Sequence, residues 1–402
     1  MCKINTERFL LDSGERYCIV VNKETGIPLY YPTLYLTTQI RNSGHAIATV
    51  ESRAVDISLF YRFLENEYID IETQILKGIF LSSTDIDRLV MYLSKVSKFR
   101  EGMNHKSGYV SKQTLRNRLN SLIHYISWLT EELLQYNSSM YKTNLSKMIK
   151  SIEKRRPRCQ KNKNYEDSEA KALSHKALNK VMELIDPQSP INPFEPKVRN
   201  RNAMIIIILF ELGIRGGELL NIKIGDINFQ KKRIYIQRRA DEISDPRLNQ
   251  PLVKTLSRVL PLSDELACKL MDYIIHDRKN YNMSKTDFLF ITYKSGPYQG
   301  QPLSISGYQK IISKLSGCDL LIKGLSGHKL RHTWNYNFSL LMDSVKAGEK
   351  EQEKIRERLM GWKDNSGTAT KYNKRFIDEK TDEASIRLQK RLSNKRGSLG
   401  ND

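Results

Sequence analysis

The chain has 402 residues and carries 66 lysines and arginines against 45 aspartates and glutamates, a formal net charge of +21 at pH 7. With 39% hydrophobic and 28% charged residues, the composition excludes wholesale disorder and collagen-like chains. A prior of roughly 150 residues per domain predicts between two and three domains. The longest apolar run, 203–210, is far shorter than the roughly 20 residues that a membrane-spanning helix needs.

The five cysteines are scattered and form no C-x-x-C pair, which disfavours a disulfide framework and a cysteine-rich zinc site. No apolar stretch follows the amino-terminal charge, so no secretory signal is expected. We therefore expect a cytoplasmic protein without a membrane partner. The surplus of positive charge has three interpretations: a chain with many surface lysines, one that binds a polyanion, or one that binds an anionic membrane, which no strongly amphipathic terminal helix supports. The net positive charge favours a nucleic-acid partner, because a basic surface neutralises phosphates and releases their counterions.

Residues 1–48 are predicted to form a small β-prone N-terminal segment, with strands at 17–21 and 34–39. The period becomes helical from residue 49, and 49–153 are predicted to form an all-α domain of four short helices. One of these helices follows an N-cap signal at Ser82, and another covers 112–134 with a basic start.

Residues 154–173 are predicted to be a basic linker, because six of the ten residues in 154–163 are basic and none is acidic. Such a stretch is either a solvated tether or a strap that follows a phosphate backbone. A second domain is expected over 174–376, with helices first, an antiparallel sheet at 233–237 and 259–261, and helices again afterwards. The predicted fold is mainly α with a small antiparallel sheet (α+β), followed by a C-terminal helix or tail at 377–402.

Nucleotide-binding loops are absent from the sequence: there is no G-x-x-x-x-G-K-[ST] and no G-x-G-x-x-G at a strand-to-helix turn. His328 and His332 lie four residues apart, as in zinc-dependent hydrolases. Lys329 stands where those enzymes need a glutamate, and a cation there would repel zinc. We expect neither a metal nor a cofactor.

Five short segments stand out because they combine basic, polar and glycine residues. Arg215 emerges at a glycine-punctuated turn after the apolar run, and Lys254 lies at a basic hairpin tip. In chain order the segments are G-x-R-x-x-E-L from Gly213, K-T-x-x-R-x-x-P-L from Lys254, H-x-L-R-H-T from His328, L-x-G-W from Leu359, and Tyr372. This order resembles the tyrosine recombinase (phage integrase) family over 174–376, with a weaker likeness to its helical core-binding domain across 50–150.

The resemblance implies phosphoryl transfer without metal or ATP, so protein cations must neutralise the charge that develops at phosphorus. Arg215 and Arg331 would bind the non-bridging oxygens, because an arginine fork grips two oxygens. Lys254 would protonate the leaving 5′-oxygen. Glu218 is expected to brace Arg215 as an i,i+3 partner.

The same resemblance makes Tyr372 the nucleophile that forms a 3′-phosphotyrosine bond. His328 would hydrogen-bond the phosphate and assist proton transfer. Trp362 stands where a histidine is commoner; its indole N–H can donate a hydrogen bond but cannot shuttle protons. The sequence departs from the family's usual pattern in a charged insert at 346–354 and in a longer gap between Trp362 and Tyr372.

The implied function is a site-specific DNA recombinase or integrase that acts through a Holliday junction for a mobile element or phage. The implied partners are double-stranded DNA enclosed by a C-shaped clamp, three further copies in a homotetramer, and accessory DNA-bending proteins. The tail at 377–402 would dock on a neighbouring subunit. Two alternatives stay open: an enzyme like type IB topoisomerases, and a DNA-binding regulator with an inactive site.

Overall fold

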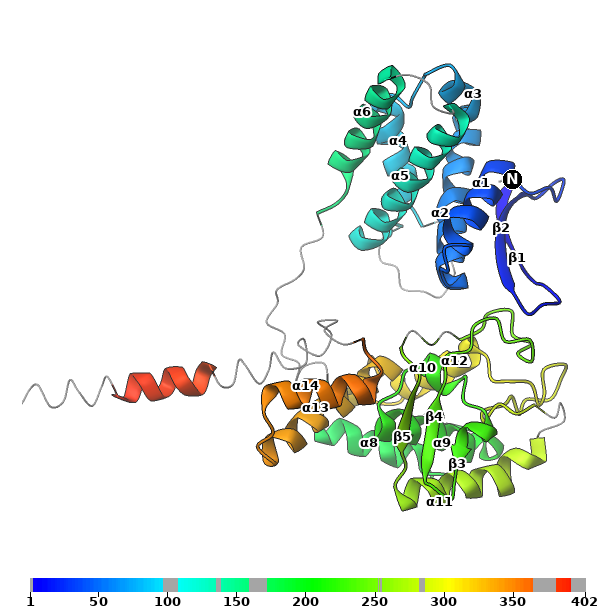
Figure 1. Cartoon of the computed structure of the whole chain (residues 1–402). Helices are drawn as coiled ribbons and strands as arrows, with labels where there is room; N and C mark the ends of the chain where they lie inside the picture. Colours follow the sequence, from blue (N-terminus) through cyan, green and yellow to red (C-terminus); the bar gives the residue numbers. More distant parts are fainter. Residues whose placement is uncertain are drawn as a thin grey trace, which may run out of the picture. The chain divides into compact units, whose positions relative to one another are not determined.

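The computed structural model describes residues 3–96, 108–134, 139–158, 172–251, 253, 255–281, 286–363 and 381–391. The chain divides into two compact units, 1–163 and 164–402 (Figure 1).

The N-terminal unit opens with an antiparallel hairpin. Strands β1 (Ile4–Leu10) and β2 (Arg16–Asn22) pair in register from Ile4 opposite Asn22 to Leu10 opposite Arg16. Alternate residues of β2 are buried, and the hairpin packs on helix α2 (Ile47–Asn66). The predicted strand at 17–21 is therefore confirmed.

The predicted strand at 34–39 is wrong, because this stretch is helical. Helix α1 (Tyr30–Tyr35) runs directly into a π-helical segment η1 (Leu36–Arg41). The hydroxyls of Thr37 and Thr38 each donate to the carbonyl oxygen four residues earlier at 2.8 Å, a helical back-bond that a strand cannot form. The buried residues Pro32, Tyr35, Leu36 and Ile40 follow the i, i+3, i+4 spacing of a helix and not the alternation of a strand.

The remaining described residues of this unit are mainly helical, as predicted, and they contain one more helix than the four expected within 49–153. The additional helix, α3, has only six residues and shows too few turns for a periodic pattern. Ser82 caps α4 through a capping box with Asp85. The helices are α2, α3 (Ile71–Leu76), α4 (Ser83–Ser94), α5 (Lys112–Leu134) and α6 (Ser139–Arg155).

Two residues of the basic stretch are already engaged inside the N-terminal unit. Arg155, the last residue of α6, donates from Nε to the Asp87 carboxylate at 2.5 Å. Arg156 donates to Asn120 at 2.8 Å and to Glu153 at 3.0 Å. These two arginines fasten the end of α6, so they are not part of a free tether.

The C-terminal unit is mainly helical around a three-stranded antiparallel sheet of order β3-β4-β5, which confirms the predicted fold class. Ile234 of β4 faces Leu260 of β5. Its elements are α8 (His175–Ile185), α9 (Pro196–Leu212), α10 (Gly216–Leu219), η2 (Ile224–Asp226), β3 (Ile227–Asn228), β4 (Arg233–Ile236), β5 (Arg258–Pro261), α11 (Asp264–Asp272), η3 (Tyr273–Asp277), η4 (Arg278–Tyr281), α12 (Ile305–Ser316), η5 (Leu320–Ile322), α13 (Gly327–Ser344) and α14 (Glu349–Met360).

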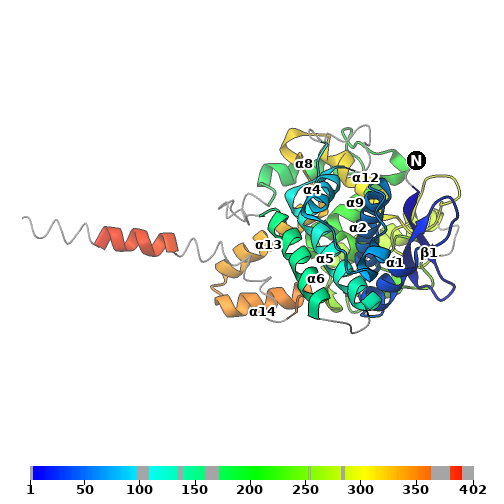
Figure 2. The same ribbon diagram turned by 90° about the horizontal axis from the view of Figure 1, so that it is seen from above.

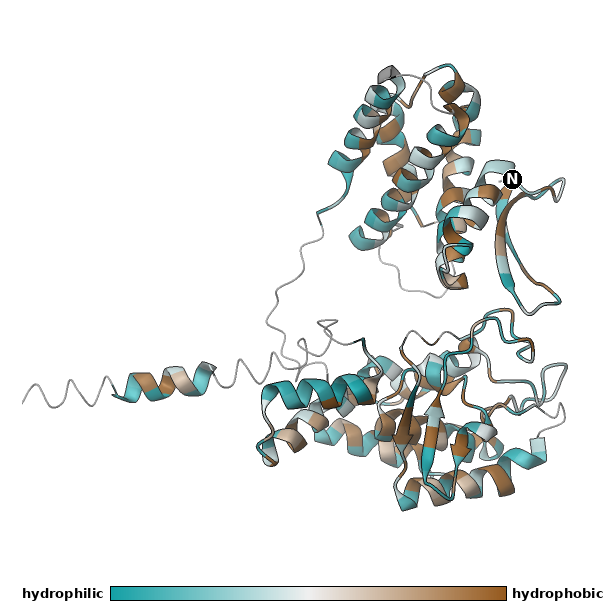
Figure 3. Cartoon of the chain, in the orientation of Figure 1, coloured by the Kyte–Doolittle hydropathy of each residue, from teal (hydrophilic) through white to brown (hydrophobic). Residues whose placement is uncertain are grey.

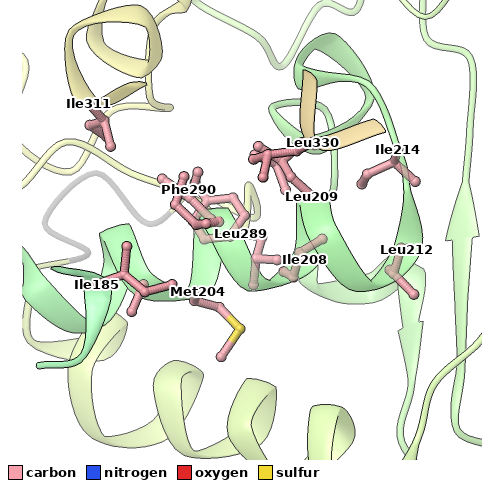
Figure 4. Packing of buried hydrophobic residues seen from close by; sticks show 14 of the residues in the cluster. Ile185, Met204, Ile208, Leu209, Leu212, Ile214, Leu289, Phe290, Ile311 and Leu330 are labelled. Carbon is pink, nitrogen blue, oxygen red and sulfur yellow. The ribbon is translucent and has the colours of Figure 1, made fainter. Parts of the chain in front are cut away.

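Helix α9 forms the centre of this unit. Its residues from Ala203 to Leu209 are buried on nearly all sides, as expected of a helix that is apolar all round. Figure 4 shows Ile208 and Leu209 of α9 among Leu289, Phe290 and Leu330. Within the described parts of the chain, no helix is both long and apolar enough to cross a membrane.

Helices α13 and α14 lie side by side in both views (Figures 1 and 2). Arg356 of α14 donates to Ser339 Oγ at 2.8 Å, and Gln352 donates to Asp343 at 3.3 Å. The charged insert at 346–354 provides the start of α14, which is hydrophilic along most of its length (Figure 3). In the tail, 381–391 are helical with exposed side chains.

Candidate active site

The end of α9 places Arg215 at a sharp turn. Gly213 follows α9 in the left-handed conformation, with φ 60° and ψ 18°. A Cβ at this position would lie 2.7 Å from the Trp334 ring, so the close packing requires glycine. The chain then turns at Arg215, which precedes α10, and the side chain of Arg215 is 32% exposed.

Arg331 links this turn to two other parts of the unit. It lies in the first half of α13, which Ser326 caps by accepting from the Lys329 backbone N–H at 3.0 Å. Arg331 Nη1 donates to the Gly213 carbonyl at 2.7 Å, and Nη2 donates to the Met360 carbonyl at 3.3 Å. The side chain therefore joins the ends of α9 and α14, and it is 1% exposed.

The carboxylate of Glu218 is the point where the arginines meet. Its Oε2 accepts from the Arg215 backbone N–H at 3.0 Å and from Arg258 Nη2 at 2.8 Å, and lies 4.0 Å from Arg331 Nη1. Oε1 accepts from Thr255 Oγ1 at 2.5 Å and lies 3.6 Å from Arg215 Nη1. The predicted i,i+3 brace is present, but Glu218 holds far more than Arg215. We call Glu218, Arg215, Arg258 and Arg331 the arginine cluster.

Charge balance decides the protonation state of Glu218. Burial raises the pKa of this carboxyl, but the Arg258 charge, its hydrogen bond and the Arg331 charge outweigh burial and hold the pKa below its usual range. An ionised carboxylate inside a cluster of three guanidinium groups leaves the site with net positive charge. Arg215 Nη1 makes no hydrogen bond within the described part of the chain, although it lies 3.6 Å from Glu218 Oε1.

His328 lies one turn before Arg331 on α13. Burial lowers its pKa, and the positive charges of Arg331 and Arg215 lower it further, because each disfavours the imidazolium form. The imidazole is therefore neutral at neutral pH and can accept a proton. The ring of His332 lies edge-on to it, with ring centroids 4.4 Å apart. In the described residues, no group of three or more His, Cys, Asp and Glu is placed to hold a metal ion.

Trp362 is fixed by the way α14 ends. Gly361 adopts the left-handed conformation, and the Trp362 backbone N–H donates to the Glu357 carbonyl at 3.0 Å, a Schellman-type end. The indole packs against Met360 and Trp334, and Arg331 Cζ lies 5.6 Å from its ring centroid. Trp362 is thus buried beside Arg331, as its large apolar ring favours.

Four of the six predicted site residues therefore come together in the structure: Arg215, His328, Arg331 and Trp362. The other two, Lys254 and Tyr372, lie outside the described residues. The sequence predicted no role for Thr255 and Arg258, which both contact Glu218. Both residues belong to the K-T-x-x-R motif, but a sequence spacing does not indicate which carboxylate they contact.

A cleft of about 790 Å³ opens beside this cluster, between β5 and the end of α14. Arg258 and Trp362 form part of its wall. The other charged side chains on the wall are Arg233, Lys354, Glu357 and Arg358, so positive charge prevails. Such a wall attracts anions more strongly than a flat surface would.

The sequence profile of the Phage integrase family matches residues 171–377, about half of the chain. The chain belongs to the phage integrase family. This integrase is a tyrosine-type site-specific recombinase, and the arginine cluster lies inside the matched region.

Two groups of curated relatives agree with this assignment. The integrase is 22% identical to transposase A from transposon Tn554 of Staphylococcus aureus over 317 residues, covering 76% of this chain and 78% of the transposase. It is 24% identical to tyrosine recombinase XerS of Streptococcus mutans over 281 residues, covering 67% of this chain and 70% of XerS.

Solved structures show the same fold. The XerH site-specific recombinase bound to palindromic difH substrate, a post-cleavage complex, matches with a TM-score of 0.51 and 20% identity, covering 85% of this chain and 80% of XerH. Its pre-cleavage complex matches with a TM-score of 0.50 and 18% identity, covering 89% and 85%. These neighbours confirm the recombinase fold.

Proposed function

We propose that this integrase cuts and rejoins double-stranded DNA through a 3′-phosphotyrosine bond, with Arg215, Lys254, His328, Arg331, Trp362 and Tyr372 as its catalytic residues. The observation that carries the proposal is the arginine cluster: Arg215 and Arg331, from distant parts of the chain, meet at one buried carboxylate beside His328 and Trp362. This arrangement is a fixed site with net positive charge.

The cluster supplies what phosphoryl transfer needs. Charge accumulates on the non-bridging oxygens as the nucleophile approaches phosphorus, and preorganised donors in a low-dielectric site stabilise it. Arg215, whose side chain is partly exposed, would contact these oxygens first. Arg331 is held by two carbonyl oxygens and adds a second fixed charge.

Two proton transfers accompany the bond exchange. The Tyr372 oxygen bonds to phosphorus and its phenolic proton leaves; neutral His328 assists that transfer, in line with its lowered pKa. The bond from phosphorus to the 5′-oxygen breaks, and Lys254 gives that oxygen a proton. The reverse reaction, with a 5′-hydroxyl from another strand, rejoins DNA without a further energy source.

We further propose that the integrase serves a mobile element or phage, exchanges strands through a Holliday junction and works as a homotetramer that clamps DNA in a C shape. The likeness to a transposase of Tn554 supports the first part. The tail at 377–402 would dock on a neighbouring subunit, and accessory DNA-bending proteins would be further partners.

The test is covalent trapping. Wild-type protein is incubated with sheared genomic DNA from its source, denatured, and the attached DNA ends are sequenced. A duplex of the recovered site, nicked close to the cut, then serves as a suicide substrate. We expect a denaturation-resistant adduct with wild type and none with Tyr372→Phe. Tyr298→Phe, which removes the hydroxyl of an exposed tyrosine, serves as the matched control and should react normally.

The alternatives predict other outcomes. Equal DNA retention by wild type and Tyr372→Phe with no adduct in either would favour an inactive regulator. Adducts without sequence preference, together with relaxation of supercoils and no strand exchange between two duplexes, would favour an enzyme like type IB topoisomerases.

A further inference from the structure

The loop between β4 and β5 is held at Glu218 by two side chains that have no step of their own in the proposed mechanism: Thr255 of the loop and Arg258, the first residue of β5. Thr255 is 5% exposed, and so is the side chain of Arg258. Thr255 directly follows Lys254, to which the proposed function assigns protonation of the leaving oxygen. The two residues are therefore placed to control where that loop lies.

Thr255, Arg258 and Glu218 form a closed triangle of hydrogen bonds. The Thr255 hydroxyl donates to Glu218 Oε1 at 2.5 Å and accepts from Arg258 Nη1 at 3.2 Å. Arg258 Nη2 closes the triangle by donating to Glu218 Oε2 at 2.8 Å. Only a hydroxyl both donates and accepts in this way, so valine, which has the same shape, cannot replace threonine here.

Other contacts fasten the loop on both sides of residue 254. Val253 is buried, and the Leu256 backbone N–H donates to the Gly361 carbonyl at 2.9 Å. Arg258 Nε donates to the Leu359 carbonyl at 2.6 Å. The loop is thus tied both to the arginine cluster and to the end of α14, which leads to Trp362.

We propose that Thr255 and Arg258 are positioning residues that hold the β4–β5 loop so that Lys254 reaches the leaving 5′-oxygen. This inference rests on the proposed function. A general acid must come within hydrogen-bond reach of the atom it protonates. A displacement of about 1 Å can cost on the order of 100-fold in rate, so the loop contacts next to Lys254 matter for the reaction.

The test uses the leaving group itself. In a suicide duplex whose bridging 5′-oxygen is replaced by sulfur, the leaving group departs as a thiolate, because thiols ionise with a pKa of about 8.5 and need no proton donor. A defect in Lys254 positioning should therefore disappear on the sulfur duplex. For Thr255→Val we expect adduct formation about 10- to 100-fold slower on ordinary DNA, because a displaced acid loses part of the roughly 100- to 10,000-fold that general-acid catalysis contributes. On the sulfur duplex we expect a rate within about 3-fold of wild type.

Four further variants serve as comparisons and controls for Thr255→Val. Lys254→Ala should show the same selective rescue, and Thr255→Ser should keep nearly full activity on both duplexes, because it restores the hydroxyl. Arg331→Ala should be slow on both, because it removes charge stabilisation. Ser257→Ala is the matched control: its hydroxyl accepts from the Arg238 backbone N–H at 3.2 Å, away from the triangle, and both rates should stay unchanged.

Equal slowing of Thr255→Val on both duplexes, or no slowing on either, overturns the proposal. If that variant does not fold, Arg258→Lys opens the triangle at another corner, since one ammonium cannot span Glu218, Thr255 and the Leu359 carbonyl. The same oxygen-selective defect is expected from it, and its absence also overturns the proposal. A wild type that forms no adduct with either duplex refutes the proposed function itself, which separates the two failures.

Discussion

At the scale of single residues, Glu218 shows how a buried acid organises a basic site. A carboxylate in the interior is costly unless it is paired and hydrogen-bonded. Glu218 meets that condition through Arg258, Thr255 and the Arg215 backbone. In return it fixes the directions of guanidinium groups that would otherwise repel one another. The acid is therefore a structural requirement of the cationic site.

This arrangement predicts how stability depends on pH. The folded-state pKa of Glu218 is lowered, so its contribution to the free energy of unfolding is fully present above the unfolded pKa and is lost as pH falls through the folded pKa. We expect the free energy of unfolding of Glu218→Gln to be about 3–5 kcal/mol lower than that of wild type at pH 7, as for a broken buried ion pair. Below about pH 4.5 its stability should fall less steeply with pH than that of wild type, because this carboxyl no longer titrates. Urea unfolding at both pH values measures this.

The control for that experiment is Glu183→Gln, which removes an exposed carboxylate paired with Lys180. A surface pair contributes only about 0–1 kcal/mol, so little change is expected. Wild-type stability of Glu218→Gln at pH 7 would contradict the role given to the buried carboxylate.

At the scale of elements, the site is built from the ends of helices. The end of α9 presents the Gly213 carbonyl, the end of α14 presents the Met360 carbonyl, and Arg331 of α13 binds both. Helix ends leave carbonyl groups without intrahelical partners, so they are natural acceptors for an arginine. Three helices are thereby locked at one point.

Gly213→Ala tests this lock. The left-handed conformation costs a residue with a Cβ about 1–2 kcal/mol, and here the Cβ would also lie 2.7 Å from the Trp334 ring. We expect a loss of at least about 2 kcal/mol in the free energy of unfolding and reduced cleavage, measured by urea unfolding and adduct formation. Gly225→Ala, where a Cβ would meet open space, should change the stability by no more than about 0.5 kcal/mol. Similar stabilities for the two variants would refute the packing argument.

At the scale of the whole molecule, the basic residues behind the net charge of +21 fall into two groups, those paired within the fold and those that remain for solvent or a ligand. Arg155 and Arg156 pair with acidic or polar groups of their own unit, and the arginine cluster shares Glu218. The remaining basic residues of 154–163 are Lys154, Arg158, Lys161 and Lys163, of which the last two lie outside the described residues. These residues are the candidates for sequence-independent contact with phosphates.

The triple variant Arg158→Gln, Lys161→Gln, Lys163→Gln tests that division. Each lost phosphate contact lowers the slope of log K against log salt by about 0.9, so we expect weaker DNA binding and a slope reduced by about 2–3. Cleavage at saturating protein should be unchanged. Arg155→Gln is the matched control, because its charge is already paired: it should lower stability and leave the salt slope as it is. The reverse pattern would place the phosphate contact at Arg155.

The sequence by itself determined the features that local rules govern. The helix at 112–134, the apolar helix around 203–210, the Ser82 cap and the pair of strands at 233–237 and 259–261 follow from periodicity and capping, and all are present. The order of the five motifs also identified the family. At 34–39 the local pattern misled, because threonine back-bonds and burial of alternate helical turns outweighed strand propensity.

Only the tertiary structure decided which groups meet. Glu218 contacts Arg258 across 40 residues of sequence, and Arg331 contacts Gly213 across 118. No sequence period links such positions. They meet because the middle of α9 is buried on nearly all sides and its left-handed end directs the next turn towards α13 and β5. Several residues can pair with an arginine locally, but only packing shows that one carboxylate serves Arg215, Arg258 and Arg331 together. A buried charge is stable only when it is paired and hydrogen-bonded, so Glu218 needs these partners.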